Sequence, residues 1–228
     1  MKILAIDTAL GATSACVLEA GADAAEASES IAMARGHAEA LLPLVDRVMA
    51  RVDGGFDALS RIAVTVGPGS FTGLRIGIAA ARAIGIACKV PVVGVSTLAA
   101  LAAPLIVEQK PGEIAAAIDA RHGNIFLAVF GPDGRIVRPP LMTGIRDAVR
   151  LLEPGRLRLV GSGAPMLAIE AAAAGHIVEL TGRETIPDIL YVARLGLLAD
   201  PLTTPARPLY LKAPDAKPLA GSAVLTPP

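Results

Sequence analysis

The chain has 228 residues, enough for one large domain or two small ones and for a self-sufficient hydrophobic core. Lysine and arginine together number 21, as do aspartate and glutamate, so no global field attracts a polyanion and this chain alone is not expected to grip RNA. Aromatic residues make up only 3%, which indicates an aliphatic interior and few stacking platforms for single-stranded nucleic acid.

The first half of the sequence is typical of an α/β fold. Its N-terminal run MKILAIDT has one basic residue and is interrupted by Asp7, which indicates a strand rather than a signal peptide. Apolar runs and helical periodicity predict strands at 3–6, 14–19, 61–66 and 92–95, and helices at 36–51 and 72–88.

An uncharged segment, 90–107, approaches the length of a membrane span. Pro91, Gly94 and Pro104 interrupt it, and Ser96 is a candidate helix N-cap. We therefore predict a buried strand followed by a helix, and no membrane contact.

The chain then repeats its opening pattern, because 115–131 echoes 3–21. Each stretch is an apolar strand ending in Ile-Asp, a short glycine-containing turn and a second apolar strand. The echo predicts two tandem units, 1–108 and 113–200, divided at the EQKPG break.

The second unit is expected to contain a strand at 158–160 and helices at 164–174 and 187–200. Seven of the eighteen prolines follow residue 200, so 201–228 is predicted to be an extended or partly disordered proline-rich tail, with 208–211 as a candidate edge strand.

The stretch VGPGSFTGLR, 66–75, is rich in glycine at a strand-to-helix junction. It has no lysine at the Walker position, and Thr72 stands where the dinucleotide fingerprint needs its third glycine, so neither phosphate motif fits. Downstream, small residues recur every fourth position, at Gly73, Gly77, Ala81 and Gly85.

Each glycine inside a helix costs about 1 kcal/mol relative to alanine, so this small-residue ridge predicts a closely packed neighbour. The neighbour could be internal or belong to another subunit, and the helix statistics favour neither. The candidate neighbouring helix at 37–51 has more apolar positions than a single stripe, and its Pro43 implies a kink or a start near Glu39.

Candidate catalytic and metal-binding residues are sparse. His37, His122 and His176 lie in separate predicted elements without metal-site spacing, and neither GxSxG nor HExxH occurs. Ser70 has no base at a recognisable local spacing. Cys16 and Cys88 lie in apolar contexts, which indicates buried, reduced thiols.

Asp7 and Asp119 each end a predicted strand and precede a turn, where α/β folds gather ligands. Either carboxylate could hold Mg²⁺ through water or cap the backbone N–H groups of its own turn. Capping is the more frequent use of aspartate at such a position and is the favoured interpretation.

Five motifs together resemble the TsaB (YeaZ) family, the partner subunit of tRNA threonylcarbamoyladenosine synthesis. They are ILAIDTA, GHAEALLPLV, VGPGSFTGLRIG, VPVVGVSTL and AAIDARHG, all within residues 1–130. The second half resembles the family loosely, through VGSG at 160–163 and RPLYLK at 207–212, and the tail after 212 departs from the family pattern.

The resemblance implies two tandem actin-like (RNase H-like) domains of the Hsp70 and sugar kinase superfamily. It implies a cytoplasmic, non-catalytic scaffold that heterodimerises with a TsaD-type transferase acting on adenosine 37 of tRNAs reading ANN codons. A TsaE-type ATPase, a homodimer when the partner is missing, and tRNA bound only through the complex are also implied. The isolated chain would need no cofactor, and ATP or ADP with Mg²⁺ could bind in the complex.

The family's partner-binding bundle corresponds to the helices at 37–51 and 70–88. The expected interface residues are His37, Leu41, Leu44, Val45, Val48, Ser70, Phe71, Gly73, Leu74, Arg75, Gly77, Ile78, Ala81 and Arg82.

Two rival functions remain. The first is an ATP-binding actin-like enzyme with a site at Asp7, Thr8, Asp119, Gly161 and Gly163, although DTALGAT stands where a DxGGxT phosphate loop is needed. The second is a peptidase, for which the sequence offers neither a nucleophile and base pair nor the HxxxH of TsaD-like proteins.

Overall fold

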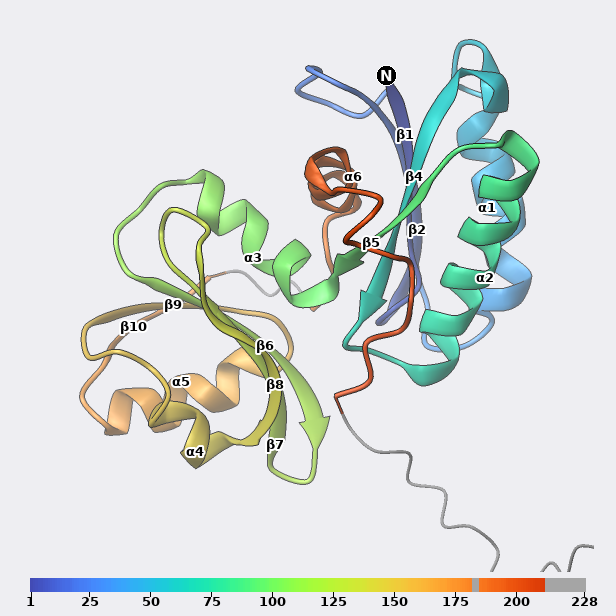
Figure 1. Ribbon diagram of the computed structural model, residues 1–228. Helices are drawn as coiled ribbons and strands as arrows, with labels where there is room; N and C mark the ends of the chain where they lie inside the picture. The colour runs from blue at the N-terminus through green and yellow to red at the C-terminus, as the bar shows by residue number, and fades with distance from the viewer. Residues whose placement is uncertain (182–184, 212–228) are drawn as a thin grey trace, which may run out of the picture.

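A computed structural model describes residues 1–181 and 185–211 of the chain. These residues form two five-stranded mixed sheets flanked by helices (Figure 1). The first sheet has the order β3-β2-β1-β4-β5, with bounds β1 (Lys2–Asp7), β2 (Ala12–Glu19), β3 (Ala27–Ala32), β4 (Leu59–Gly67) and β5 (Val92–Ser96). The second has the order β10-β9-β6-β7-β8, with bounds β6 (Glu113–Arg121), β7 (Asn124–Phe130), β8 (Ile136–Gly144), β9 (Arg156–Val160) and β10 (Ile177–Leu180).

The two sheets share one topology. Each begins with an antiparallel three-stranded meander, β1-β2-β3 or β6-β7-β8. Two further strands are then added in parallel, β4 and β5 or β9 and β10. This shared order confirms the predicted fold class of two tandem actin-like halves. The Ile-Asp echo lies in equivalent strands, at the end of β1 and two residues before the end of β6, which continues to Arg121.

Three of the described helices begin after a residue whose side chain caps the helix N-terminus. Ser70, Ser96 and Asp188 each accept a backbone N–H bond from the first turn that follows them. The bounds are α1 (His37–Met49), η1 (Gly55–Ala58), α2 (Phe71–Cys88), α3 (Thr97–Val107), α4 (Ile145–Val149), α5 (Ala164–Ala173) and α6 (Ile189–Leu198). Pro43 lies inside α1, which begins before Glu39.

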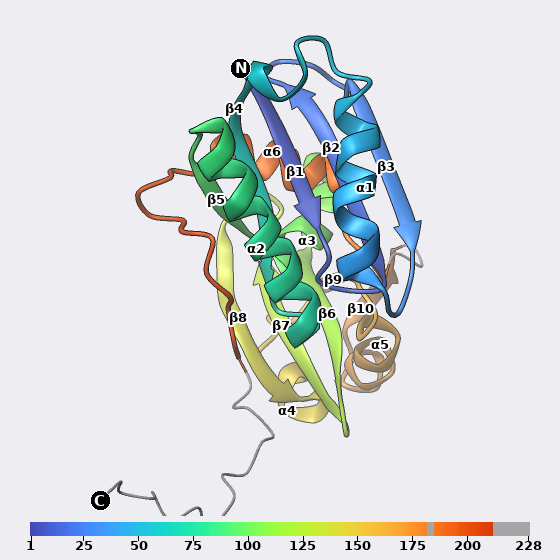
Figure 2. The same cartoon turned by 90° about the vertical axis from the view of Figure 1, so that its right-hand side faces the viewer.

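Helices α1 and α2 lie side by side on one face of the first sheet (Figure 2). Their inward residues share a core with that sheet, and this core contains Leu41 and Leu44 of α1 and Leu74 and Ile78 of α2. The buried aliphatic side chains of these helices are what hold them on the sheet.

Helices α3 and α6 contact each other between the two sheets (Figure 1). Helix α3 follows the first sheet in sequence, yet Leu98, Leu101 and Leu105 pack in one cluster with strands of the second. Arg158 of β9, fully buried, donates to the Leu105 carbonyl over 2.9 Å and strengthens this attachment.

Helix α6 follows the second sheet in sequence but packs on the first. Its Ile189, Val192 and Ala193 pack on the first sheet, and Arg61 of β4 donates to three carbonyls at the end of α6, those of Gly196, Leu197 and Ala199. The predicted unit 113–200 therefore needs correction, because the apolar face of α6 matches the first sheet rather than the second.

Residues 201–211, called the strap below, run along the edge strand β5 and beside α2. The Thr204 carbonyl accepts from Gly94 N at 2.9 Å, and Leu209 N donates to the Val66 carbonyl at 2.7 Å. The candidate edge strand at 208–211 does not form, since an isolated bridge at Pro205 is what joins the strap to β5 and Pro208 has no N–H to donate. The rest of the predicted tail, 212–228, lies outside the described residues.

Candidate partner interface

The small-residue ridge of α2 faces the interior of its own chain. A Cβ added at Gly77 would lie 2.5 Å from Thr8 Oγ1, one at Gly73 would meet the Thr8 carbonyl, and one at Gly85 would meet Val92. Because these glycine positions carry no side chain, α2 can pack closely against the first sheet. These contacts favour the internal alternative for the ridge over a subunit contact.

Most of the expected interface residues are buried with the ridge. They pack in the first-half core or against it and so present no surface to a partner: His37, Leu41, Leu44, Val45, Val48, Gly73, Leu74, Gly77, Ile78 and Ala81. His37 uses its ring in a 2.8 Å hydrogen bond between Nδ1 and Thr13 Oγ1. The exposed members of the expected set are Ser70, Phe71, Arg75 and Arg82.

A different set of residues forms the outer face of the two helices. Leu42 of α1 is 57% exposed and Ile86 of α2 is 79% exposed. The α2 face turned toward α1 is also apolar, with Ala83 and Ala87 exposed and Ile76, Ala80 and Ile84 half-buried. An exposed apolar surface of this kind is typical of an interface.

Within the described residues, α2 is the one helix whose length and composition would suffice to cross a membrane. Its mean hydropathy is 1.4, and 33% of it is buried in the fold. A single apolar helix packed on a sheet is weak evidence for a membrane span, and its exposed apolar residues are those described above.

The turn after β1 is closed by its own chain. Asp7 Oδ1 accepts from Ala9 N at 3.0 Å and from Thr65 Oγ1 at 2.5 Å, as the capping interpretation predicts. Asp7 Oδ2 is buried with no hydrogen-bond partner among the described residues, and burial raises the pKa of this carboxyl group. Thr8 is 1% exposed, and its hydroxyl donates to the Gly73 carbonyl at 2.7 Å.

The N-terminal turn of α2 covers Asp7 and Thr8, since Ser70 N donates to the Ala9 carbonyl at 2.7 Å. Asp7 is 0% exposed, so a Mg²⁺ nucleotide has no access to this carboxylate while the turn is closed. The nucleotide site at Asp7 and Thr8 stays a prediction, and it would require the N-terminal turn of α2 to move away from these residues.

The remaining nucleotide candidates form a separate group in the second half. Asp119 Oδ1 accepts from Arg121 N at 2.7 Å, and Asp119 N donates to Ser162 Oγ at 3.1 Å. Gly163 N donates to the Ala117 carbonyl at 2.9 Å, and a Cβ at Gly161 would strike that same carbonyl. These contacts close the glycine loop onto β6, much as the α2 turn closes onto β1.

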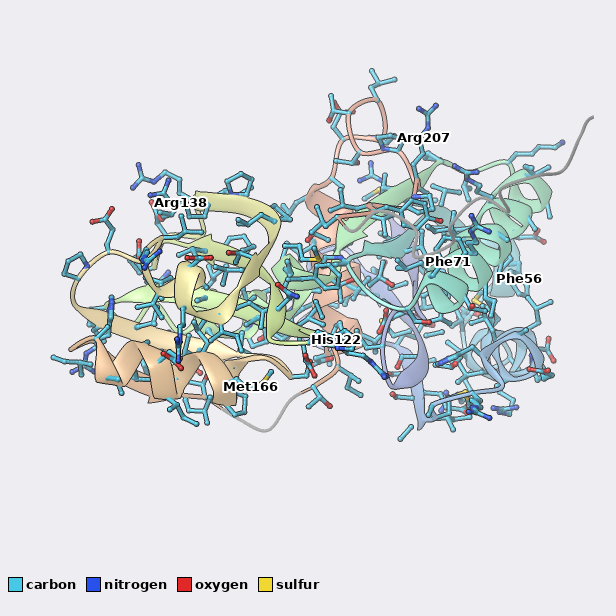
Figure 3. The ribbon with its side chains drawn as sticks, turned by 90° about the horizontal axis from the view of Figure 1, so that it is seen from below. Phe56, Phe71, His122, Arg138, Met166 and Arg207 are labelled. Carbon is cyan, nitrogen blue, oxygen red and sulfur yellow. The ribbon has the colours of Figure 1, made fainter. Side chains whose placement is uncertain are left out.

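Other chemistry is limited within 1–181 and 185–211, where no group of three His, Cys, Asp or Glu residues is placed to hold a metal ion. Burial raises the pKa of the Cys16 thiol to about 12, which makes it unreactive, while Cys88 is only half-buried. His122 lies at the β6–β7 turn, near the junction of the two halves (Figure 3).

An aromatic cluster that the sequence did not predict lies at the start of α2. The rings of Phe71 and Tyr210 have centroids 5.3 Å apart, and Arg75 Cζ lies 3.8 Å from the Phe71 centroid. Arg75 Nε also donates to the Tyr210 hydroxyl at 3.1 Å. Phe71 and Arg207 lie on the half that carries α2 (Figure 3).

Comparison with known families gives a match over residues 30–159 to the family described as TsaD: tRNA N6-adenosine threonylcarbamoyltransferase. The tRNA threonylcarbamoyladenosine biosynthesis protein TsaB of Escherichia coli is 35% identical over 133 residues, which cover 58% of this chain and 56% of that protein. The chain thus spans little more than half the length of this relative. An uncharacterized protein of Mycobacterium tuberculosis H37Rv is 35% identical over 96% of this chain and 95% of its own length.

Solved structures show the same fold over nearly the whole chain. YeaZ from Pseudomonas aeruginosa aligns with a TM-score of 0.72 at 25% identity, covering 92% of this chain and 99% of its own. A second structure, an uncharacterized protein with similarity to peptidase YEAZ from the same organism, aligns with a TM-score of 0.75 at 26% identity and the same coverage.

Proposed function

Because the chain belongs to the TsaB (YeaZ) family of tRNA threonylcarbamoyladenosine biosynthesis, we propose that it is a non-catalytic subunit that binds a TsaD-type transferase. The complex, together with a TsaE-type ATPase, would modify adenosine 37 of tRNAs that read ANN codons. The same face would form a homodimer when the transferase is absent.

The observation that carries this proposal is the apolar outer face of α1 and α2. Leu42, Ile76 and Ala83 belong to a surface whose members on α2 carry no charge, and its small residues allow a partner helix to approach closely. A partner helix would bury these side chains, and at about 25 cal/mol per Å² this burial would stabilise the complex.

The non-catalytic role is supported by how the reactive side chains are used. The Ser70 hydroxyl accepts from Gly73 N as the cap of α2, and His37 is bonded to Thr13, so neither takes part in a nucleophile and base pair with the other. Asp7 is sealed beneath the α2 turn. We therefore assign any ATP or ADP with Mg²⁺ to the complex rather than to the Asp7 turn.

The interface is tested with Ala83→Glu, which puts a charge at the centre of the apolar face. Ala172→Glu is the matched control, because Ala172 is an exposed alanine of α5 in the other half. Each variant is mixed with the TsaD-type partner and analysed by size-exclusion chromatography with light scattering, and tRNA nucleosides are then assayed for threonylcarbamoyladenosine.

We expect wild type and Ala172→Glu to form a 1:1 complex and to support the modification. We expect Ala83→Glu to weaken the complex on the order of a hundredfold, since a charge buried without a partner costs about 3 kcal/mol. An undiminished complex with Ala83→Glu would refute this interface, and a wild-type chain that forms no complex would refute the proposed partner.

A further inference from the structure

We propose that the strap side of α2 is a contact surface for unpaired RNA, with Phe71 and Tyr210 stacking on a base and Arg75, Arg82 and Arg207 supplying positive charge to the phosphate backbone. The surface itself is argued from its own geometry. The identification of the RNA with the tRNA of the modification reaction rests on the proposed function.

The aromatic part of this surface is built from distant parts of the chain. The sequence contains four Phe, two Tyr and no Trp, and two of these six residues meet here, although they are 139 positions apart (210 − 71). Phe71 is 49% exposed and Tyr210 is 46% exposed, so both rings are accessible. Exposed rings of this kind are what single-stranded nucleic acids stack on.

The strap is fixed in place, so the rings are preorganised. Arg82 donates to the Ala206 carbonyl at 2.6 Å, and Leu209 N bonds to Val66. Arg75 stacks on Phe71 and bonds to Tyr210 through Nε, which leaves its terminal amino groups available to a phosphate or a base edge. A rigid stacking surface loses little entropy when a base binds.

The two sequence segments that form the surface contain arginine and no carboxylate. No Asp or Glu occurs from 58 to 107 or from 201 to 214. Arg75, Arg82 and Arg207 are exposed, and none of them joins an ion pair among the described residues. The chain is neutral overall, so this concentration of arginine without carboxylate is local, and it fits a polyanion.

This surface is distinct from the proposed protein interface. At 3.6 residues per turn, Phe71, Arg75 and Arg82 are centred roughly 120° around α2 from Ile76, Ala80 and Ala83. Figure 2 shows α2 lying between α1 and the strap, so the two faces point to opposite flanks of the helix. A protein bound across α1 and α2 would therefore leave the strap side open.

RNA is favoured over an acidic protein because the groups gathered around Phe71 are a second ring and a guanidinium group, those of Tyr210 and Arg75. The larger aliphatic surface of α2, with Ile76, Ala80 and Ala83, lies on the other flank, where it suits the hydrophobic core of a protein interface. Stacked bases next to phosphates use both the rings and the charges found here.

The test measures binding of the full chain to a fluorescein-labelled oligoadenylate of about 15 nucleotides, at several salt concentrations from about 50 mM upward. The comparison probes are a fully paired RNA duplex of the same length and a polyglutamate peptide of the same charge. The variants are Tyr210→Ser, Phe71→Leu and Arg207→Gln. The control is Arg146→Gln, an exposed arginine of α4 in the other half. Thermal melts establish that each variant is folded.

We expect Tyr210→Ser and Phe71→Leu to weaken oligoadenylate binding on the order of tenfold, with little change for the duplex. Arg207→Gln should lower the slope of log K against log salt by about 0.7, and Arg146→Gln should leave it unchanged. Oligoadenylate binding that is undetectable, or equal in all folded variants, overturns the proposal. Polyglutamate binding that is tighter than RNA and lost in the same variants overturns it in favour of an acidic protein.

The same variants are then mixed with the TsaD-type partner. A normal complex combined with unchanged RNA binding refutes the RNA surface and leaves the proposed function intact. Absence of any complex refutes the proposed function, while the measurements on the isolated chain still decide whether the strap side binds RNA.

Discussion

Replacing Gly77 by alanine separates a ridge that packs internally from one that meets a partner. The new Cβ would lie 2.5 Å from Thr8 Oγ1, where a carbon and an oxygen need more than 3 Å, and 3.5 Å from Val64 Cγ2. Thr8 has little freedom to move away, because it is 1% exposed and its hydroxyl is held by the Gly73 carbonyl.

The expected loss of stability combines three effects. Overpacking in a core costs about 1–3 kcal/mol. Loss of the Thr8 hydrogen bond adds about 1 kcal/mol. The better helix propensity of alanine returns about 1 kcal/mol. The variant should therefore be about 2 kcal/mol less stable than wild type, a fall in Tm of about 4–8 °C for a chain of this size.

Thermal and urea unfolding followed by circular dichroism measure this change. Gly11→Ala is the matched control, since its Cβ would meet nothing closer than Ile186 at 4.0 Å. Thr8→Ala removes the obstructing hydroxyl, so the double variant Thr8→Ala with Gly77→Ala should lose about 1 kcal/mol less than the sum of the single changes. A Gly77→Ala protein that melts like wild type but no longer binds its partner would refute the internal packing of the ridge.

Two further changes test buried polar groups of the first half. Folding raises the pKa of Asp7 above its ordinary 3.8, so the folded state holds the proton to higher pH than the unfolded chain, and Asp7 reduces stability as pH rises from 3.8 through the raised value. Asp7→Asn should flatten this dependence, and a stability difference from wild type that stays constant from pH 4 to pH 8 would contradict it. Arg61→Met removes the donor of three α6 carbonyls and should cost about 2 kcal/mol in urea unfolding. Arg138→Met, which removes a single bond to the Leu151 carbonyl, is its control and should cost less than half as much.

The elements that the sequence predicts best are those with long apolar runs. Strands β1, β4 and β5 and helices α1, α2 and α6 were all expected within a few residues of their bounds. The missed strands lie on the flanks of the sheets, where one side faces water. β3 has the sequence ASESIA, β8 contains Pro139 and Pro140, and β10 has only four residues. Such strands form because a neighbouring strand offers hydrogen bonds, and no local pattern encodes that.

The site shows the same limit. A four-residue spacing establishes that Gly73, Gly77 and Gly85 share one side of α2, but a sheet and a second subunit both require small residues there. The spacing therefore could not predict whether these small residues face the sheet of their own chain or a second subunit. The contact between Phe71 and Tyr210 joins residues 139 positions apart in the sequence (210 − 71), and only the tertiary fold brings them together.

Helix α3 packs with the second sheet and α6 packs on the first. This arrangement sets the order in which the fold can be completed during synthesis. The first sheet has its strands by Ser96, yet the helix that covers its second face ends at Leu198, and the strap that borders β5 follows at 204–209. Until those residues leave the ribosome, the apolar residues Ile3, Leu18 and Val93 lack the cover of α6. We therefore expect the nascent first half to expose apolar surface, and a chain truncated before residue 189 to aggregate rather than to form a smaller stable domain.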